Sequence, residues 1–198
     1  MLKTKAETIF NNIFLVLLFL LIVGTPLVFT TMTRAVFEVN KLLLLRIVTI
    51  LVCSTWFFKY ILFRANGFSL RFKKTGLEWP LLFLIIANFL STVFSQNLRL
   101  SLLGSYDRWE GIYTVLNYLL LILIYSKLTT RKYQFFWLVG GILFSTGLSA
   151  FYGVFQSLGL DSLFNWSMDP ERRVFACINN PVHFCAYVAM VVPLGLGA

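Results

Sequence analysis

Charged residues are scarce in this chain of 198 residues, and acidic ones are the scarcer. Only 13% of the residues are charged, whereas an ordinary soluble domain carries about 25%. The sequence also lacks a linker, a low-complexity tract and the internal repeat that marks many transporters. A separate soluble domain is therefore excluded, and we expect a single transmembrane domain over residues 1–198.

Histidine and cysteine are also rare, with one histidine and three cysteines in the whole chain. Their spacing matches no metal-ligand pattern, so we expect no metal and no other cofactor. Cys53 and Cys185 fall in apolar runs and are expected to act as small core residues. A disulfide between Cys177 and Cys185 is the alternative in an oxidising compartment.

Long apolar runs dominate the chain, and hydrophobic residues make up 59% of it. An α-helix rises 1.5 Å per residue, so crossing a hydrocarbon core about 30 Å thick takes about 20 residues. The runs predict an all-α, multi-span transmembrane helical bundle with five full spans and a sixth cut by the chain end. The expected spans cover residues 12–30, 42–63, 79–95, 111–125, 135–158 and 181–198.

The last run is still apolar at Ala198, where the sequence stops. We therefore expect the chain to be a fragment of a longer protein. The first run is too long for the core of a signal peptide, and no small-residue cleavage site follows it. We expect it to be retained as a membrane span, with Pro26 kinking it or ending it early.

Lysine and arginine are unevenly divided among the loops, and this asymmetry predicts the orientation. With a cytoplasmic N-terminus, the inner segments are strongly basic, whereas the outer segments carry both signs of charge. The net charge of +9 does not predict a nucleic-acid partner, because the charges are spread over short loops and form no continuous face. The expected partner is the lipid bilayer, and any site should lie in the outer loops.

The outer loop between the third and fourth runs ends in the cluster Tyr106-Asp107-Arg108-Trp109-Glu110. An arginine between two carboxylates and beside aromatic rings is able to hold a phosphate or a sugar hydroxyl. Arg108 and Asp107 are therefore candidate substrate-binding residues. The alternative is an interfacial anchor whose charges pair internally.

The segment before the sixth run carries two adjacent arginines, Arg172 and Arg173, and two amides, Asn179 and Asn180. Guanidinium groups form forked bonds to phosphate oxygens. A helix that begins at Pro181 would direct its amino-terminal N–H groups toward the same place and favour an anion. The segment predicts a diphosphate site at the outer membrane surface, and the alternative is a positively charged loop with a polar helix cap.

A few polar or small residues interrupt the apolar runs. Arg46 either snorkels to the membrane surface or faces a polar interior. Asn88 and Asn117 are expected to form hydrogen bonds between helices. The fifth run carries small residues at steps of four, which predict a close helix contact: Gly141, Ser145, Ser149 and Gly153.

The two outer loops resemble a known family. Residues Ser101–Ile112 (SLLGSYDRWEGI) are similar to the Ser-Leu-x-Gly…Arg-x-x-Gly-Leu pattern of bacterial O-antigen ligases and O-antigen polymerases. Residues Arg173–Leu194 resemble that family's Arg-x-x-Gly/Ser-x-x-x-Asn-Pro-x-x-x-Ala-Tyr…Pro-Leu segment. Residues Pro26–Phe29 and Phe37–Leu45 look like its N-terminal part, so the resemblance covers essentially the whole chain.

This resemblance implies a multi-pass protein of the bacterial plasma (inner) membrane. Such a glycosyltransferase moves a glycan from an undecaprenyl-diphosphate carrier to a glycan or lipid acceptor on the outer face, without a metal. The resemblance implies that Arg173, with Arg172 beside it, acts in catalysis by binding the diphosphate as it leaves. Arg108 matches a motif position of unassigned role, and Asn180 and Pro181 match the Asn-Pro pair.

The family's catalytic histidine lies in a later outer loop, and His183 does not occupy that position. The resemblance therefore implies the N-terminal part of a polysaccharide-biosynthesis ligase or polymerase that is inactive alone but active as the full-length parent. Two alternatives stay open: a membrane transporter-like protein and an inactive truncated remnant.

Overall fold

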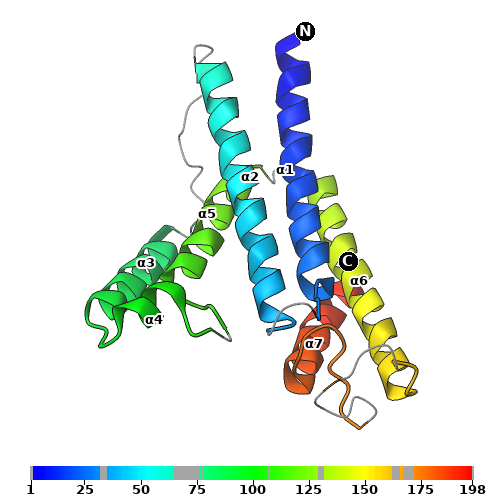
Figure 1. Ribbon diagram of the computed structural model, residues 1–198. Helices are drawn as coiled ribbons and strands as arrows, with labels where there is room; N and C mark the ends of the chain where they lie inside the picture. The colour runs from blue at the N-terminus through cyan, green and yellow to red at the C-terminus, as the bar shows by residue number, and fades with distance from the viewer. Residues whose placement is uncertain are drawn as a thin grey trace. The chain divides into compact units, whose positions relative to one another are not determined.

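The computed structural model describes residues 2–31, 35–64, 76, 78–106, 108–128, 132–161, 166 and 172–197 (Figure 1). Each regular element within these ranges is a helix, which confirms the all-α prediction for the described part of the chain. The helices are α1 (Leu2–Leu27), α2 (Glu38–Arg64), α3 (Glu78–Val93), α4 (Leu98–Leu103), α5 (Ile112–Leu128), α6 (Lys132–Ser157) and α7 (Pro181–Gly197).

Apart from the short α4, each helix coincides with one of the predicted apolar runs. Within the described ranges, three helical segments are long and apolar enough to cross a membrane: Lys5–Leu27, Glu38–Phe63 and Lys132–Ser157. Three further segments are apolar but shorter: Glu78–Val93, Ile112–Ser126 and Pro181–Gly197. Membrane-spanning helices are therefore supported, and the arrangement of five full spans stays a prediction.

Helix α1 ends at Leu27, earlier than the expected Thr30, and Pro26 explains the difference. Proline has no backbone N–H, and its ring clashes with the carbonyl four residues earlier, so a helix rarely continues far beyond it. The N–H of Val28 still donates to the carbonyl of Gly24 at 2.8 Å, and the helix stops there.

The chain divides into two compact units, and α1 and α2 contribute to both. The first unit contains Met1–Leu17 and Leu45–Thr130, and the second contains Leu18–Leu44 and Arg131–Ala198. Because α1 and α2 run through both units without a break, this division does not test the expected single transmembrane domain.

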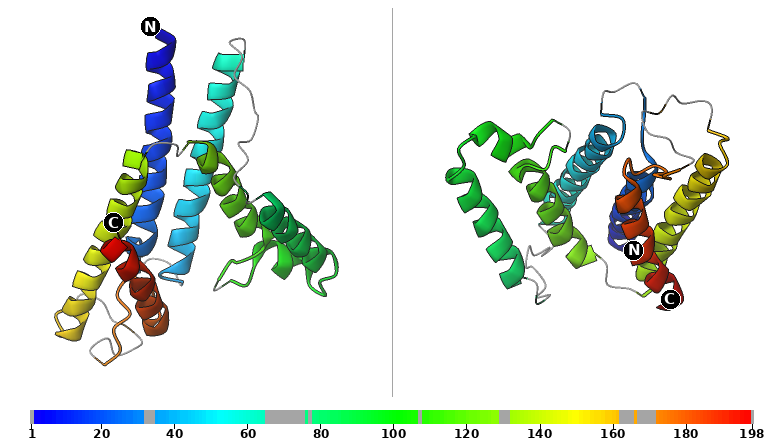
Figure 2. Two further views of the ribbon diagram at one scale, coloured as in Figure 1. Left: turned by 180° about the vertical axis from the view of Figure 1, so that it is seen from behind. Right: turned by 90° about the horizontal axis from the view of Figure 1, so that it is seen from below.

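In the first unit, α3, α4 and α5 pack against one another (Figure 2). The side-chain oxygen of Asn97 accepts the N–H of Leu100 at 3.3 Å and so caps the start of α4. Gly104 follows α4 with a φ of +86°, and a Cβ there would overlap the backbone of Trp109 and Glu110. Only glycine therefore allows the loop to return so closely against the end of α4.

Two long-range hydrogen bonds join other helices of the first unit. The Nζ of Lys59 donates to Oδ1 of Asn11 at 2.8 Å, which links α2 to α1. The hydroxyl of Tyr125 donates to the carbonyl oxygen of Phe14 at 2.9 Å, which links α5 to α1. Both bonds connect residues more than 40 positions apart in the sequence.

The prediction that Asn88 and Asn117 bond between helices is wrong. Their amide groups donate to the carbonyl oxygens four residues earlier in their own helices, at 2.8 Å and 2.7 Å. An asparagine side chain is short, so the carbonyl of the preceding turn is the nearest acceptor within an apolar helix.

In the second unit, the small-residue face of α6 is buried, as predicted. A Cβ added to Gly141 would lie 2.8 Å from Cε2 of Phe19, so α1 approaches α6 closely at this point. Farther along, the hydroxyl of Thr146 donates to the hydroxyl oxygen of Tyr187 in α7 at 2.8 Å. The views in Figures 1 and 2 agree that α7 lies beside α6.

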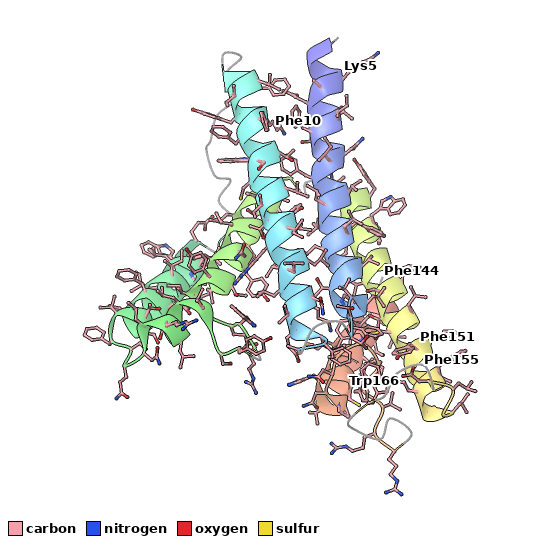
Figure 3. All side chains as sticks on the ribbon, in the orientation of Figure 1. Lys5, Phe10, Phe144, Phe151, Phe155 and Trp166 are labelled. Carbon is pink, nitrogen blue, oxygen red and sulfur yellow. The ribbon has the colours of Figure 1, made fainter. Side chains whose placement is uncertain are left out.

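A second face of α6 is open and aromatic. Figure 3 shows Phe144, Phe151 and Phe155 projecting outward from the helix, and these side chains are 58%, 63% and 41% exposed. Exposed apolar faces of this kind mark membrane or protein contacts. Since α6 is long and apolar enough to cross a bilayer, this face is suited to hydrocarbon.

Gly141 and its neighbour Gly140 provide a matched test of the α1–α6 contact. We expect Gly141→Leu to destabilise the protein by about 1–3 kcal/mol, because the added side chain must displace Phe19. Gly140→Leu has the same gain in helix propensity, and nothing lies within 4 Å of the added Cβ. Thermal unfolding in detergent measures both variants, and equal midpoints would contradict the close contact.

Candidate functional site

Residues Arg172–Asn180, here called the arginine loop, lead into α7 and contain four predicted site residues. Phe175, Ala176 and Cys177 in its centre are buried, whereas Arg172 and Arg173 at its start are exposed. The loop therefore combines a fixed core with two solvent-accessible cations at one end.

Two side chains from helices hold the backbone of the arginine loop. Gln156 of α6 is 0% exposed, and its Oε1 accepts the N–H of Ala176 at 2.8 Å. Lys41 of α2 donates from Nζ to the carbonyl oxygen of Cys177 at 2.6 Å. A buried backbone polar group must find a partner, and these two side chains provide partners that secondary structure does not.

The two asparagines predicted to bind substrate have structural partners. Asn179 donates from Nδ2 to Oε1 of Glu38 at 2.7 Å, so its amide holds the arginine loop against α2. Asn180 accepts the N–H of Val182 on Oδ1 at 2.9 Å and thereby caps α7. The alternative of a polar helix cap is confirmed for Asn180, and a role for either residue in binding substrate stays a prediction.

The backbone of the arginine loop is strained at two positions. Ala176 has a φ of +48° and Asn179 a φ of +70°, in the left-handed region that residues other than glycine rarely adopt. Such conformations persist where surrounding contacts over-determine them, and they are concentrated at ligand sites and switch regions. The contacts made by Gln156, Lys41 and Glu38 over-determine this loop.

A hydrogen-bonded carboxylate lies beside the same anchors. Oδ2 of Asp161 accepts from the hydroxyl of Tyr152 at 2.7 Å, from Nε1 of Trp166 at 2.6 Å and from Nε2 of Gln156 at 3.4 Å. The Trp166 ring in turn lies edge-on to Phe175 at a centroid distance of 5.2 Å. Gln156 thus bonds to Asp161 and to the arginine loop at once.

Aromatic rings complete the support of the arginine loop. Phe37 stacks on Phe29 and on Trp166, with both centroid distances at 5.6 Å, and meets Phe175 edge-on at 6.0 Å. Aromatic pairs at such distances add stability beyond the area they bury. The residues just before α2 therefore pack directly on the centre of the loop.

Arg172 and Arg173 are adjacent in the chain, and both are exposed at the start of the arginine loop. A guanidinium group stays charged at any physiological pH and presents several N–H donors in a fork. Two such groups on an anchored backbone can bind an anionic oxygen group such as a phosphate. Neither arginine serves as one of the anchors described above, which bind the loop at residues 176, 177 and 179.

The cysteine of the arginine loop is not a nucleophile in this setting. Burial raises the pKa of the Cys177 thiol, so the thiol stays neutral at pH 7. Cys53, Cys177 and Cys185 are all free, so the alternative of a Cys177–Cys185 disulfide is wrong for this structure.

The second predicted site lies in the first unit. Arg108 is exposed, and its N–H donates to the carbonyl of Ser105 at 3.1 Å within a turn. Asp107 lies outside the described residues.

The single histidine, His183, is exposed in the first turn of α7. No group of three or more histidine, cysteine or acidic residues within the described ranges could hold a metal.

No protein-family model, curated protein or solved structure matches the chain. The resemblance to O-antigen ligases and polymerases therefore rests on the motif residues quoted above, and the assignment stays a prediction.

Sequence reasoning did not identify Gln156 and Lys41 as the residues that fix the arginine loop. For Gln156 a usable signal exists, because it lies three residues after Gly153 and so continues the small-residue face of α6. A polar side chain on a buried face must be hydrogen-bonded. For Lys41 the partner lies 136 residues away, and no local pattern identifies it.

Cys177 reports on the anchoring of the arginine loop in a protein whose other cysteines are replaced by alanine. We expect Lys41→Met to raise the maleimide labelling rate of Cys177 about tenfold or more, because a hydrogen bond from a charged group contributes about 1.5–3 kcal/mol. The control is Lys59→Met, which removes a similar bond in the first unit. Equal labelling of the two variants would show that Lys41 is not an anchor.

Proposed function

We propose that this chain is the N-terminal part of a bacterial membrane glycosyltransferase of the O-antigen ligase and polymerase class. The full protein would transfer a glycan from an undecaprenyl-diphosphate carrier to a glycan or lipid acceptor at the outer face of the plasma membrane. The observation that carries the proposal is the pair Arg172 and Arg173, exposed at the edge of a loop whose backbone is fixed by Gln156 and Lys41.

The chemistry of such a transfer explains why fixed arginines are useful. An acceptor hydroxyl oxygen attacks the anomeric carbon, and the bond from that carbon to the carrier's phosphate oxygen breaks. The diphosphate leaves with the bonding electrons, and the hydroxyl proton passes to a general base. Arg172 and Arg173 would stabilise the negative charge that develops on the leaving oxygen.

Fixing the arginine loop before the substrate arrives would strengthen this effect. Ordering a mobile loop on binding costs conformational entropy, which reduces the free energy available for holding the diphosphate. The anchored backbone at Ala176 and Cys177 is already ordered by side chains of α6 and α2. The arginines then contribute charge at a defined position on the membrane surface.

The proposed membrane arrangement uses α1, α2, α3, α5, α6 and α7 as spans, with the N-terminus in the cytoplasm. The shorter helices fit this arrangement with local thinning of the bilayer. Helix α3, for example, has 16 residues and so rises about 24 Å against a hydrocarbon thickness of about 30 Å. The open aromatic face of α6 supports the same arrangement.

The role of Arg173 is tested in the protein as its host cell makes it. We expect Arg173→Ala to lower surface glycan transfer by about 100-fold or more, as the loss of a donor to developing negative charge does elsewhere. Arg173→Lys should retain part of the activity, because it keeps the charge and loses the fork. Arg99→Ala, at an exposed arginine of α4, is the control. Unchanged transfer in Arg173→Ala would remove this residue from the mechanism.

The orientation is tested by labelling single cysteines placed in a cysteine-free protein. We expect a membrane-impermeant maleimide to label Arg108→Cys and Arg173→Cys on intact cells, because both positions are predicted to lie outside. Lys5→Cys should be labelled only after the membrane is permeabilised. Labelling of the two arginine positions from the cytoplasmic side would overturn the proposed function.

A further inference from the structure

Two buried hydrogen-bond donors lie close together in the first unit. Nη2 of Arg46 and Nε1 of Trp109 are both inaccessible to solvent, and neither has a hydrogen-bond partner within the part of the chain that the structure describes. The guanidinium carbon of Arg46 lies 5.9 Å from the centroid of the Trp109 ring. Nη2 of Arg46 therefore has neither solvent nor a described internal acceptor as a partner.

Such a pair is unusual, because buried polar groups in proteins almost always have partners. An unpaired charged donor is the least favourable case, since it loses its hydration without compensation. Two unpaired donors at one place within the described residues indicate what kind of group would pair with them. The complementary group is one that only accepts hydrogen bonds and carries negative charge.

Two backbone acceptors of the surrounding loop are already engaged. The carbonyl of Ser105 accepts the N–H groups of Arg108 at 3.1 Å and Trp109 at 2.7 Å. The carbonyl of Trp109 accepts the hydroxyl of Thr114 at 2.7 Å. These bonds direct the carbonyl oxygens of Ser105 and Trp109 toward the loop's own donors, and Nη2 of Arg46 and Nε1 of Trp109 stay unpaired.

The position of Trp109 is fixed by the fold of its loop. Its φ is +53°, a strained value for a residue that is not glycine. The returning backbone lies close to the end of α4. A Cβ at Gly104 would overlap the backbone of Trp109 and Glu110, and a Cβ at Gly111 would overlap that of Leu102 and Gly104. Strain held in place by close packing is typical of ligand-binding positions.

We propose that Arg46 and Trp109 form a binding site for a phosphate-type oxyanion. The guanidinium would contribute charge and a forked donor, and the indole N–H would contribute a second, directional donor. Arg46 lies about 12 Å along α2 from its first residue, Glu38, so the site lies within the first turns of an apolar helix. At that depth the anion is either the phosphate of a lipid headgroup or a soluble phosphate that enters from water.

The site does not rest on the arginine loop, which carries the proposed glycosyl transfer. None of its residues belongs to the arginine loop, and its charge requirement follows from two unpaired donors alone. Loss of transfer in Arg173→Ala would therefore neither support nor weaken it, and the two proposals can fail separately.

The test uses the purified chain in phosphate-free detergent with ¹⁵N-labelled tryptophan. The indole N–H signal of Trp109 is assigned by its disappearance in Trp109→Phe. We expect this signal to shift on titration with inorganic phosphate, or with phosphatidylglycerol in mixed micelles, and not with sodium chloride at equal ionic strength. A shift with phosphate identifies a soluble anion, and a shift with phosphatidylglycerol alone identifies a lipid headgroup.

Arg46→Gln should weaken the titration about tenfold or more, because it removes the charge while keeping a polar side chain. Arg99→Gln, at an exposed arginine of the same unit, should leave it unchanged. If Arg46→Gln does not fold, the titration of the unmodified protein still decides. A Trp109 signal that responds to neither phosphate nor phosphatidylglycerol, or that responds equally to chloride, overturns the proposal.

Discussion

The second unit depends on one constraint, which is that a buried loop between apolar helices must have its backbone polar groups paired. Gln156 meets part of this constraint, because its Oε1 accepts the backbone N–H of Ala176. The Nε2 of the same side chain donates to the carboxylate of Asp161. Lys41 pairs the next carbonyl, at Cys177. With these bonds in place, the loop can hold a strained backbone conformation and still lead directly into α7. The aromatic rings around it then fill the remaining space.

Much of the fold could be predicted from the sequence, because helices in apolar chains are specified locally. The apolar runs coincide with the six long helices, and Pro26 explains why α1 ends where it does. The small residues of α6 also predicted its buried face, since a step of four keeps side chains on one side of a helix. The number of spans does not follow from the apolar runs alone, because the apolar segments of α3, α5 and α7 are shorter than those of the three long helices.

The supports of the candidate site could not be predicted in the same way, because they join residues far apart in the sequence. Lys41 and Cys177 are 136 positions apart, and a loop sequence does not reveal which helix ends surround it. The error at Asn88 has a related cause, since whether an amide bonds locally or across helices depends on neighbours that the sequence does not identify. The sequence allowed two interpretations of Arg46 for the same reason. The environment of Arg46 depends on the loop that contains Trp109, more than 60 residues later in the chain.

The anchors at Ala176 and Cys177 bind main-chain atoms, and this has an evolutionary consequence. A main-chain N–H and carbonyl are present whatever side chain the residue carries, so the shape of the loop does not require a particular sequence at its exposed start. Position 173 can therefore change with little loss of stability, because the bonds that fix the loop are made at residues 176, 177 and 179.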